Sequence, residues 1–201
     1  MSRFRLKDLR DLFVVVVHPP DSDGQAILDQ MGRIGCRTEL IWPPQRALPP
    51  NVDIVFAGLF FDRRKELSRM LRRSDKPGPA IIGVVDYENP AMLEFVLDIG
   101  VVAVTSKPVR SFGMLTNLVV AYTGVLRQME AQERIARLEK KLAGKKIIAK
   151  AKAILIEMHG LSEENAYKLI REQAMSKRTS IEDMAQAIIN ANELLNANGK
   201  L

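Results

Sequence analysis

The first 108 residues alternate between short apolar runs and longer segments in which apolar residues recur at helical spacing. A continuous β-branched run such as 12–17 is typical of a strand that is buried on both faces. Five strands are predicted, at 12–17, 37–42, 52–56, 80–85 and 101–105, with helices at 26–34, 64–73 and 90–99. Because strands that alternate with helices favour right-handed crossovers, we predict a doubly wound, flavodoxin-like α/β domain with a five-stranded parallel sheet.

Residues 147–189 carry three short runs in which apolar positions are spaced by three and four residues. Gly160 is placed to end the first helix, Ser162 to cap the second, and Ser180 to begin the third. None of these runs is long enough to be stable alone, since about 12–15 residues is already marginal in water. We therefore predict that the three helices pack together as a small bundle.

The segment between these regions has no proline from 110 to 142 and is predicted to form a long helix. Its apolar residues form a seam with spacing of three and four, apart from a slip near Gln132. The first turns should cover the sheet, but beyond Arg127 no sheet remains, so the seam predicts a parallel coiled-coil dimer. Gly124 and Gly144 weaken the helix and could serve as flexible joints. The predicted dimer residues are Leu118, Tyr122, Val125, Met129, Ile135, Leu138 and Leu142.

Positive charge is concentrated in one segment of the chain. The net charge is +6, whereas residues 134–152 hold eight cations against Glu139 alone, or +7. A charge run is usually a solvated helix face, but so one-sided a surplus at the entrance to a small bundle favours a phosphate-facing stripe. The candidate nucleic-acid contacts are Lys145, Lys146, Lys150, Lys152, Tyr167, Lys168, Arg171, Lys177 and Arg178. Arg171 is the first choice for a specific contact, while the Tyr167 ring either packs into the bundle or stacks on a base.

Several other classes of function are disfavoured by the sequence. A single cysteine, Cys36, allows no internal disulfide and fits a reducing cytoplasm. No run of eighteen uncharged apolar residues suggests a membrane span. The only histidines, His18 and His159, lie far apart without ligand-spaced neighbours, so no metal is expected. No nucleophile–base pair or glycine-rich phosphate loop is present, and we expect neither enzymatic activity nor a cofactor.

The C-terminal helices resemble a known RNA-binding module. Residues 151–156 (AKAILI), 159–163 (HGLSE), 166–171 (AYKLIR) and the pair Ala174-Met175 are similar to the ANTAR domain of transcription antiterminators. The similarity covers about forty-five residues, and it implies binding to RNA hairpins in leader transcripts.

The N-terminal pattern, with Lys107 directly after the fifth strand, resembles the receiver domain of response regulators. That resemblance implies paired carboxylates after the first strand, a phosphoacceptor aspartate ending the third, and a lysine that contacts the phosphoryl group. Here His18 follows the first strand and Gly58 stands at the acceptor position, so only Lys107 remains of that set. Without an acceptor carboxylate or an oxygen cage for Mg²⁺, phosphoryl transfer is not expected. We interpret this region as a pseudo-receiver with a degenerate phosphorylation site.

The order of these parts resembles the AmiR/NasT family of transcription antiterminators, with local similarity to the aliphatic amidase regulators at 34–36 (IGC) and 42–44 (WPP). We expect a pseudo-receiver at 1–110, a coiled-coil dimerisation helix at 111–144 and an ANTAR domain at 145–201. The resemblance implies a homodimeric positive regulator that binds a leader-RNA hairpin and prevents termination. It also implies control through sequestration by a ligand-sensing negative regulator of periplasmic-binding-protein fold.

Two alternatives stay open at this point. A DNA-binding regulator of response-regulator type would also use a basic helical output domain, and residues 160–162 could be the turn of a helix-turn-helix. The mouth of the sheet could instead bind a metabolite, as α/β sheets often do. Prolines in place of a phosphate loop after the first strand disfavour the second alternative.

Overall fold

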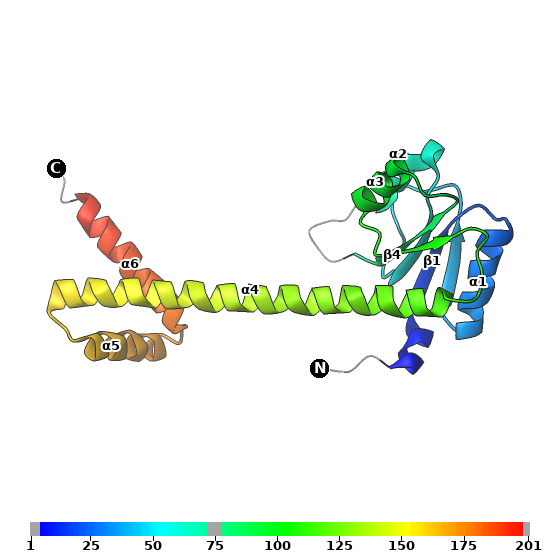
Figure 1. Cartoon of the computed structure of the whole chain (residues 1–201). Helices are drawn as coiled ribbons and strands as arrows, with labels where there is room; N and C mark the ends of the chain where they lie inside the picture. Colours follow the sequence, from blue (N-terminus) through cyan, green and yellow to red (C-terminus); the bar gives the residue numbers. More distant parts are fainter. Residues whose placement is uncertain (1–4, 72–77, 199–201) are drawn as a thin grey trace. The chain divides into compact units, whose positions relative to one another are not determined.

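The structure is a computed structural model that describes residues 5–71 and 78–198. Contacts divide the chain into two compact units, Met1–Glu130 and Ala131–Leu201, and each unit is described by itself (Figure 1). Positions 72 and 73 of the predicted helix 64–73 lie outside the described residues. Within the described residues, no helix is both long enough and apolar enough to cross a membrane.

The first unit contains the predicted five-stranded parallel sheet. Its strands are β1 Phe13–Val17, β2 Arg37–Ile41, β3 Ile54–Gly58, β4 Ala80–Val85 and β5 Ala103–Ser106. They lie in the order β2-β1-β3-β4-β5, and all four pairings are parallel. This order is that of flavodoxin-like folds and confirms the predicted fold class. The carboxyl ends of β1 and β3 are neighbours, with Val17 opposite Ala57.

Three of the predicted strands begin later than expected, β1 by one residue and β3 and β5 by two. β3 starts at Ile54 rather than at residue 52. Just before it, the Asp53 N–H donates to the Phe13 carbonyl oxygen at 3.0 Å, and the Asp53 carboxylate accepts from the Phe13 N–H at 2.8 Å. β5 starts at Ala103 rather than at residue 101. Val101 instead packs on the side of the sheet that α3 covers.

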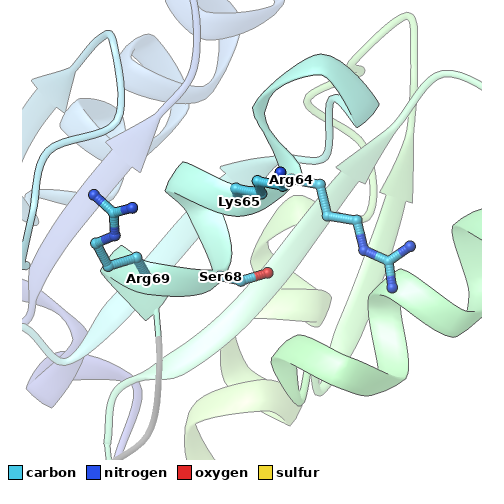
Figure 2. Close-up of a pocket in the computed structure, with 4 residues that line it drawn as sticks. All are labelled: Arg64, Lys65, Ser68 and Arg69. Carbon is cyan, nitrogen blue, oxygen red and sulfur yellow. The ribbon is translucent and has the colours of Figure 1, made fainter.

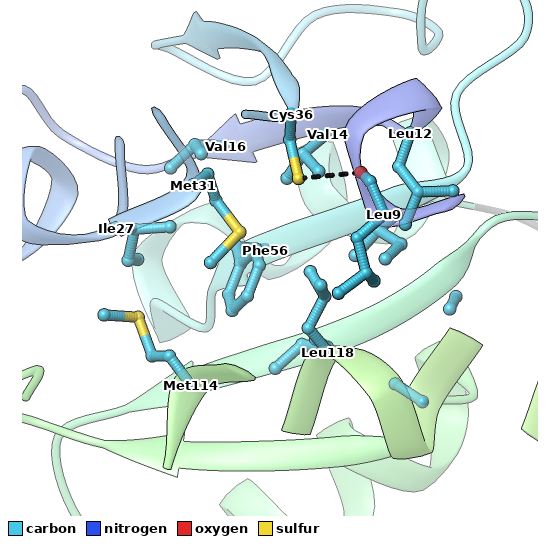
Figure 3. Close-up of a cluster of buried hydrophobic side chains, with 14 of the residues drawn as sticks. Leu9, Leu12, Val14, Val16, Ile27, Met31, Cys36, Phe56, Met114 and Leu118 are labelled. Atoms are coloured by element: carbon cyan, nitrogen blue, oxygen red, sulfur yellow. Dashed lines mark hydrogen bonds between the residues drawn. The ribbon is translucent and has the colours of Figure 1, made fainter. Parts of the chain in front are cut away.

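Helices cover both faces of this sheet. α1 Ser22–Ile34 and the first part of α4 Met114–His159 pack on one face, around Val14, Val16 and Phe56 (Figure 3). α2 Arg64–Leu71 and α3 Pro90–Ile99 pack on the other face, around the strand residues whose side chains point to that side. Two short 3₁₀ helices, Leu6–Asp11 and Phe61–Arg63, complete the unit. α1 begins four residues before its predicted start, because the Asp21 carboxylate caps it.

Cys36 belongs to this core and is not a reactive group. Its side chain is buried, and its Sγ donates to the Leu9 carbonyl oxygen at 3.2 Å (Figure 3). Burial raises the pKa of the Cys36 thiol, so the nucleophilic thiolate is disfavoured.

α4 is one uninterrupted helix, and its apolar residues divide between two faces. Leu118 is fully buried, and Val125 is also buried, in the core of the first unit. Tyr122 and Met129 pack partly buried against the same core. Leu118 and Val125 therefore cover their own sheet and leave the predicted dimer seam, whereas Tyr122 and Met129 are only partly taken up by the same core, and their place in a dimer stays a prediction.

The second half of the seam lies on a different side of α4. Ile135, Leu138 and Leu142 are more than half exposed. At about 100° per residue, the sequence spacing of Leu138 is out of phase with that of Leu118, twenty residues earlier. The slip in spacing near Gln132 thus marks the change from a sheet-facing stripe to a separate, exposed stripe. Neither Gly124 nor Gly144 interrupts the helix, so the expected flexible joints are not present as breaks.

The second unit is a helical bundle, as predicted. It combines the C-terminal part of α4 with α5 Glu163–Ser176 and α6 Ile181–Asn198, so the first predicted helix is the end of α4. Gly160 has a φ of 62° and ends α4, while the Ser162 hydroxyl accepts from the Asn165 N–H at the start of α5. The buried core consists of Ala151, Ile154, Leu155, Ala166, Ile170, Ala174, Met184, Ala185 and Ile189. Alanines at these contacts allow the helices to approach closely.

Candidate nucleic-acid interface

The basic part of α4 presents most of its cations to solvent. Lys145 and Lys146 are exposed and make no ion pair with any residue in the described ranges. Directly before them, Gly144 is buried where α6 begins, and a Cβ at this position would lie 3.0 Å from Cγ of Glu182. The glycine therefore lets the first turn of α6 pack closely on α4, which fixes the position of the following lysines.

Two of the predicted RNA contacts are already paired with carboxylates of the bundle. Lys152 Nζ lies 2.5 Å from Oε1 of Glu163, and the lysine side chain is only 21% exposed. The Glu163 carboxylate accepts this hydrogen bond, and together with the positive charge of Lys152 it lowers the pKa of Glu163. Lys150 Nζ lies 2.8 Å from Oε1 of Glu193 on α6. The bundle thus brings Lys150 and Lys152 against acidic neighbours that the sequence analysis did not single out.

α5 turns a mixed aromatic and basic face to solvent. Ala166, Ile170 and Ala174 form its buried face, whereas Tyr167 and Arg171, one turn apart, are exposed. Tyr167 is 41% exposed, so its ring has a surface available for stacking as well as a part that packs. Arg171 makes no ion pair with a described residue, which leaves its guanidinium available to a phosphate or a base edge.

The remaining predicted contacts lie around the same helix. Lys168 is 4.0 Å from Glu172, an exposed i,i+4 pair of the kind that contributes little. Lys177 follows the last turn of α5, and Arg178 adopts a φ of 53° in the turn toward α6. Both side chains are exposed. The structure therefore places seven of the nine predicted residues in solvent without a bundle partner on another helix: Lys145, Lys146, Tyr167, Lys168, Arg171, Lys177 and Arg178.

The three residues of the predicted degenerate phosphorylation site meet at the carboxyl end of the sheet. His18 follows β1, Gly58 ends β3, and Lys107 follows β5. A Cβ on Gly58 would lie 2.6 Å from Cδ2 of His18 and 2.5 Å from Cε2 of Phe60. His18 is fully buried, and its ring lies 5.4 Å from the Phe60 ring. An acceptor side chain at position 58 would therefore have no room, because an imidazole and a phenyl ring occupy that space.

Two acids near this site, Asp21 and Asp23, accept hydrogen bonds from backbone N–H groups. Burial alone would raise the pKa of Asp21, but hydrogen bonds from the Gly24 and Asp23 N–H groups and the nearby His18 and Lys107 lower it. Asp23 accepts from the Val109 N–H at 2.7 Å and so ties α1 to the loop after β5. No cluster of three or more histidine, cysteine or acidic residues within the described ranges is arranged to hold a metal ion.

Lys107 is held by partners that the sequence did not indicate. Its Nζ lies 3.2 Å from Oδ1 of Asp86 and 4.5 Å from the centre of the Phe60 ring. Phe60 in turn packs against Trp42. Asp86 follows β4, so its place at the same edge of the sheet follows from the topology. Phe60 lies in a loop, and no pattern in the chain marks its role. The Lys107 ammonium is thus engaged by a carboxylate and an aromatic ring.

A second group of cations lies on α2, beside a hollow of ≈ 560 Å³ lined by Arg64, Lys65, Ser68 and Arg69. Figure 2 shows Arg64 and Arg69 extending in opposite directions. Arg64 reaches α3, where its Nη2 lies 2.5 Å from Oδ2 of Asp98. Because these side chains diverge, α2 does not form a convergent anion site.

Comparison with known proteins agrees with both units. A family described as AmiR, N-terminal, matches residues 12–122, which is 111 of the 201 residues, and the ANTAR domain matches residues 136–189. The aliphatic amidase regulator of Pseudomonas aeruginosa is 30% identical over 184 residues, covering 92% of this chain and 94% of that protein. The transcriptional regulatory protein PdtaR of Mycobacterium tuberculosis is 23% identical over 137 residues, covering 68% of this chain and 67% of that protein.

Among solved structures, a response regulator from Thermotoga maritima has a TM-score of 0.46 at 16% identity, over 56% of this chain and 98% of that one. The family assignment rests on the sequence matches, which extend from the sheet through the C-terminal helices. The chain therefore belongs to the AmiR family of regulators with an ANTAR domain.

Proposed function

We propose that this chain is an RNA-binding transcription antiterminator, which binds a hairpin in a leader transcript and prevents a terminator from forming. The chain is an ANTAR-type regulator and not an enzyme. The observation that carries the proposal is the ANTAR match over a bundle in which most exposed cations, Lys150 excepted, lack ion-pair partners on other helices of the described residues. Such a surface suits the phosphate backbone, which dominates affinity for nucleic acids. Action on a nascent transcript would place the protein in the cytoplasm.

The proposed RNA face combines backbone and base contacts. Lys145 and Lys146 supply phosphate contacts from α4, and Lys168, Lys177 and Arg178 supply them from α5 and the turn after it. Arg171 and Tyr167 are the proposed base-reading pair, since RNA sequence is read by stacking and by hydrogen bonds to unpaired bases. Their positions one turn apart on α5 allow both side chains to reach the same loop.

Control through a protein partner fits the altered receiver site better than control through phosphorylation. Position 58 has no acceptor oxygen, its surroundings are filled by His18 and Phe60, and Lys107 is engaged by Asp86. A switch must therefore act elsewhere. We propose sequestration by a ligand-sensing negative regulator of periplasmic-binding-protein fold, by analogy with the relatives that the sequence resembles.

The exposed stripe of α4 supports a homodimer. Ala131, Ile135, Leu138 and Leu142 are exposed and spaced by four, three and four residues, the a/d spacing of a coiled coil. A parallel second copy would bury this stripe, while the sheet-facing stripe stays within its own domain. Gln128 continues the same spacing one step earlier and would form a polar layer.

RNA specificity is the first prediction of this proposal. The chain should bind a stem–loop RNA selected in vitro against it, and duplex DNA of the same sequence should bind far more weakly at equal salt. Lys145→Ala, Lys146→Ala and Arg171→Ala together should weaken RNA binding, and each lost lysine contact should reduce the log–log salt slope by about 0.7–0.9. Fluorescence anisotropy across a salt series measures both quantities.

The matched control is Lys7→Ala, Arg46→Ala and Lys65→Ala, which removes the same charge from exposed positions of the first unit. It should leave the affinity and the slope close to wild type. If the test triple behaves like this control while its bundle stays folded, the RNA face lies elsewhere. If duplex DNA binds as tightly as the selected RNA, the protein is a DNA-binding regulator.

A further inference from the structure

The two lysine–glutamate pairs that join α4 to another helix of the bundle differ in how accessible their cations are. The Lys152 side chain is 21% exposed, and Glu163 covers its amine from the first turn of α5. In the other pair, Lys150 and Glu193 are 58% and 61% exposed. The first pair is therefore a clamp between α4 and α5, whereas the second is a surface contact whose cation an external anion can reach.

The packing of α6 explains why Glu193 reaches Lys150. Ile189, one helical turn before Glu193, is buried in the core of the bundle. Ala151, the neighbour of Lys150 on α4, is fully buried in the same core. Both charged side chains thus emerge beside buried residues of one core, which brings them within reach of each other.

We propose that Glu193 acts as an internal substitute for an RNA phosphate, withholding Lys150 from RNA and thereby setting the affinity and salt dependence of the bundle. The inference rests on the proposed RNA-binding function. A carboxylate and a phosphate oxygen are both anionic acceptors for a lysine ammonium, so they compete for the same three donors. Lys152, by contrast, is a structural residue, and its partner Glu163 does not regulate binding.

The weakness of this exposed ion pair makes the competition possible. Exposed ion pairs contribute little to stability and are screened by salt. Loss of the Lys150–Glu193 contact should therefore leave the bundle folded while changing what the lysine binds. A buried pair could not behave in this way, because removal of one partner would destabilise the fold.

The test uses the full chain and the selected stem–loop RNA. Glu193→Gln, and Glu193→Ala as a second variant without the side-chain acceptor, should bind the RNA more tightly than wild type. Because one more phosphate contact forms, the advantage over wild type should grow by about three-fold when salt falls from about 200 to about 50 mM. The increase in slope separates a new contact from a general change in charge.

Two comparisons decide the outcome. Glu164→Gln removes the same charge from the same unit, at an exposed residue without an ion pair among the described residues, and should leave the salt slope unchanged. In a Lys150→Ala background, Glu193→Gln should lose its advantage, because coupled residues give non-additive effects. The inference is overturned if Glu193→Gln matches Glu164→Gln, or if its gain persists without Lys150. A wild-type chain for which no binding RNA can be selected would instead defeat the proposed function.

Discussion

Replacement of Leu118 by Asp should unfold the first unit, although the spacing of apolar residues alone assigns Leu118 to a dimer seam. The side chain is fully buried among β-strand and α1 residues, so the substitution places an unpaired charge in an apolar core. Substitutions of this kind are among those that lower the free energy of unfolding by more than about 4 kcal/mol. The single tryptophan, Trp42, lies in this unit and packs against Phe60, so its fluorescence reports the loss of structure directly.

Val120→Asp is the matched control for this experiment. Val120 lies two residues further along the same helix and is 59% exposed. Its replacement should leave the Trp42 signal and the unfolding midpoint of the first unit nearly unchanged. If Leu118→Asp folds normally and is monomeric, Leu118 belongs to the dimer seam after all, and the division of α4 into two stripes is incorrect.

The second large effect is expected at the exposed stripe. Ile135→Asp, Leu138→Asp and Leu142→Asp together should convert a dimer into monomers, because a coiled coil cannot bury charges at successive a and d positions without partners. Sedimentation velocity at micromolar concentration, with and without RNA, measures the change. The Trp42 fluorescence of this variant should match wild type, since the stripe lies outside the core of the first unit.

A control for added charge is available on the same helix. Gln132, Ala136 and Ala143 are exposed and lie off the stripe, so their replacement by Asp adds three charges without entering the seam. This control should remain dimeric. A wild-type chain that sediments as a monomer both alone and with RNA would contradict the proposed dimer, and a stripe variant that stays dimeric would move the interface elsewhere.

The sheet could be predicted because strands buried on both faces leave an unambiguous record in the sequence. β1 and β4 appear as continuous apolar runs, and helices with clear stop signals at Gly35 and Gly100 separate the strands. The start of β3 could not be predicted, because Asp53 makes backbone hydrogen bonds to Phe13 and Ala80 as a strand residue would, yet lies before the strand. Periodicity does not distinguish such a residue from a strand residue.

α4 illustrates a limit of periodicity over long helices. Leu118 and Leu138 both have apolar neighbours at three and four residues, so one continuous seam is a natural reading of the sequence. Only the position of the sheet shows that the first stripe is satisfied within the domain. The slip at Gln132 was the available signal, because a genuine coiled coil would hold its register there.

The altered receiver site was partly predictable for a topological reason. Residues that follow parallel strands meet at one edge of the sheet, which brings His18, Gly58 and Lys107 together. Phe60 comes from a loop, and its contact with Lys107 depends on backbone geometry that no local pattern encodes. Glu193 is forty-three residues from Lys150, so its role emerges only once α6 is packed on α4.

The most direct test of the central claim is transcription through a terminator. In a reconstituted reaction, the template carries the selected stem–loop placed so that it overlaps an intrinsic terminator, and full-length and terminated transcripts are counted. The wild-type chain should raise the fraction of full-length transcripts. The variant with Lys145→Ala, Lys146→Ala and Arg171→Ala should not raise it. The control variant with Lys7→Ala, Arg46→Ala and Lys65→Ala should act like wild type. An unchanged full-length fraction with wild-type protein bound to that RNA would contradict antitermination.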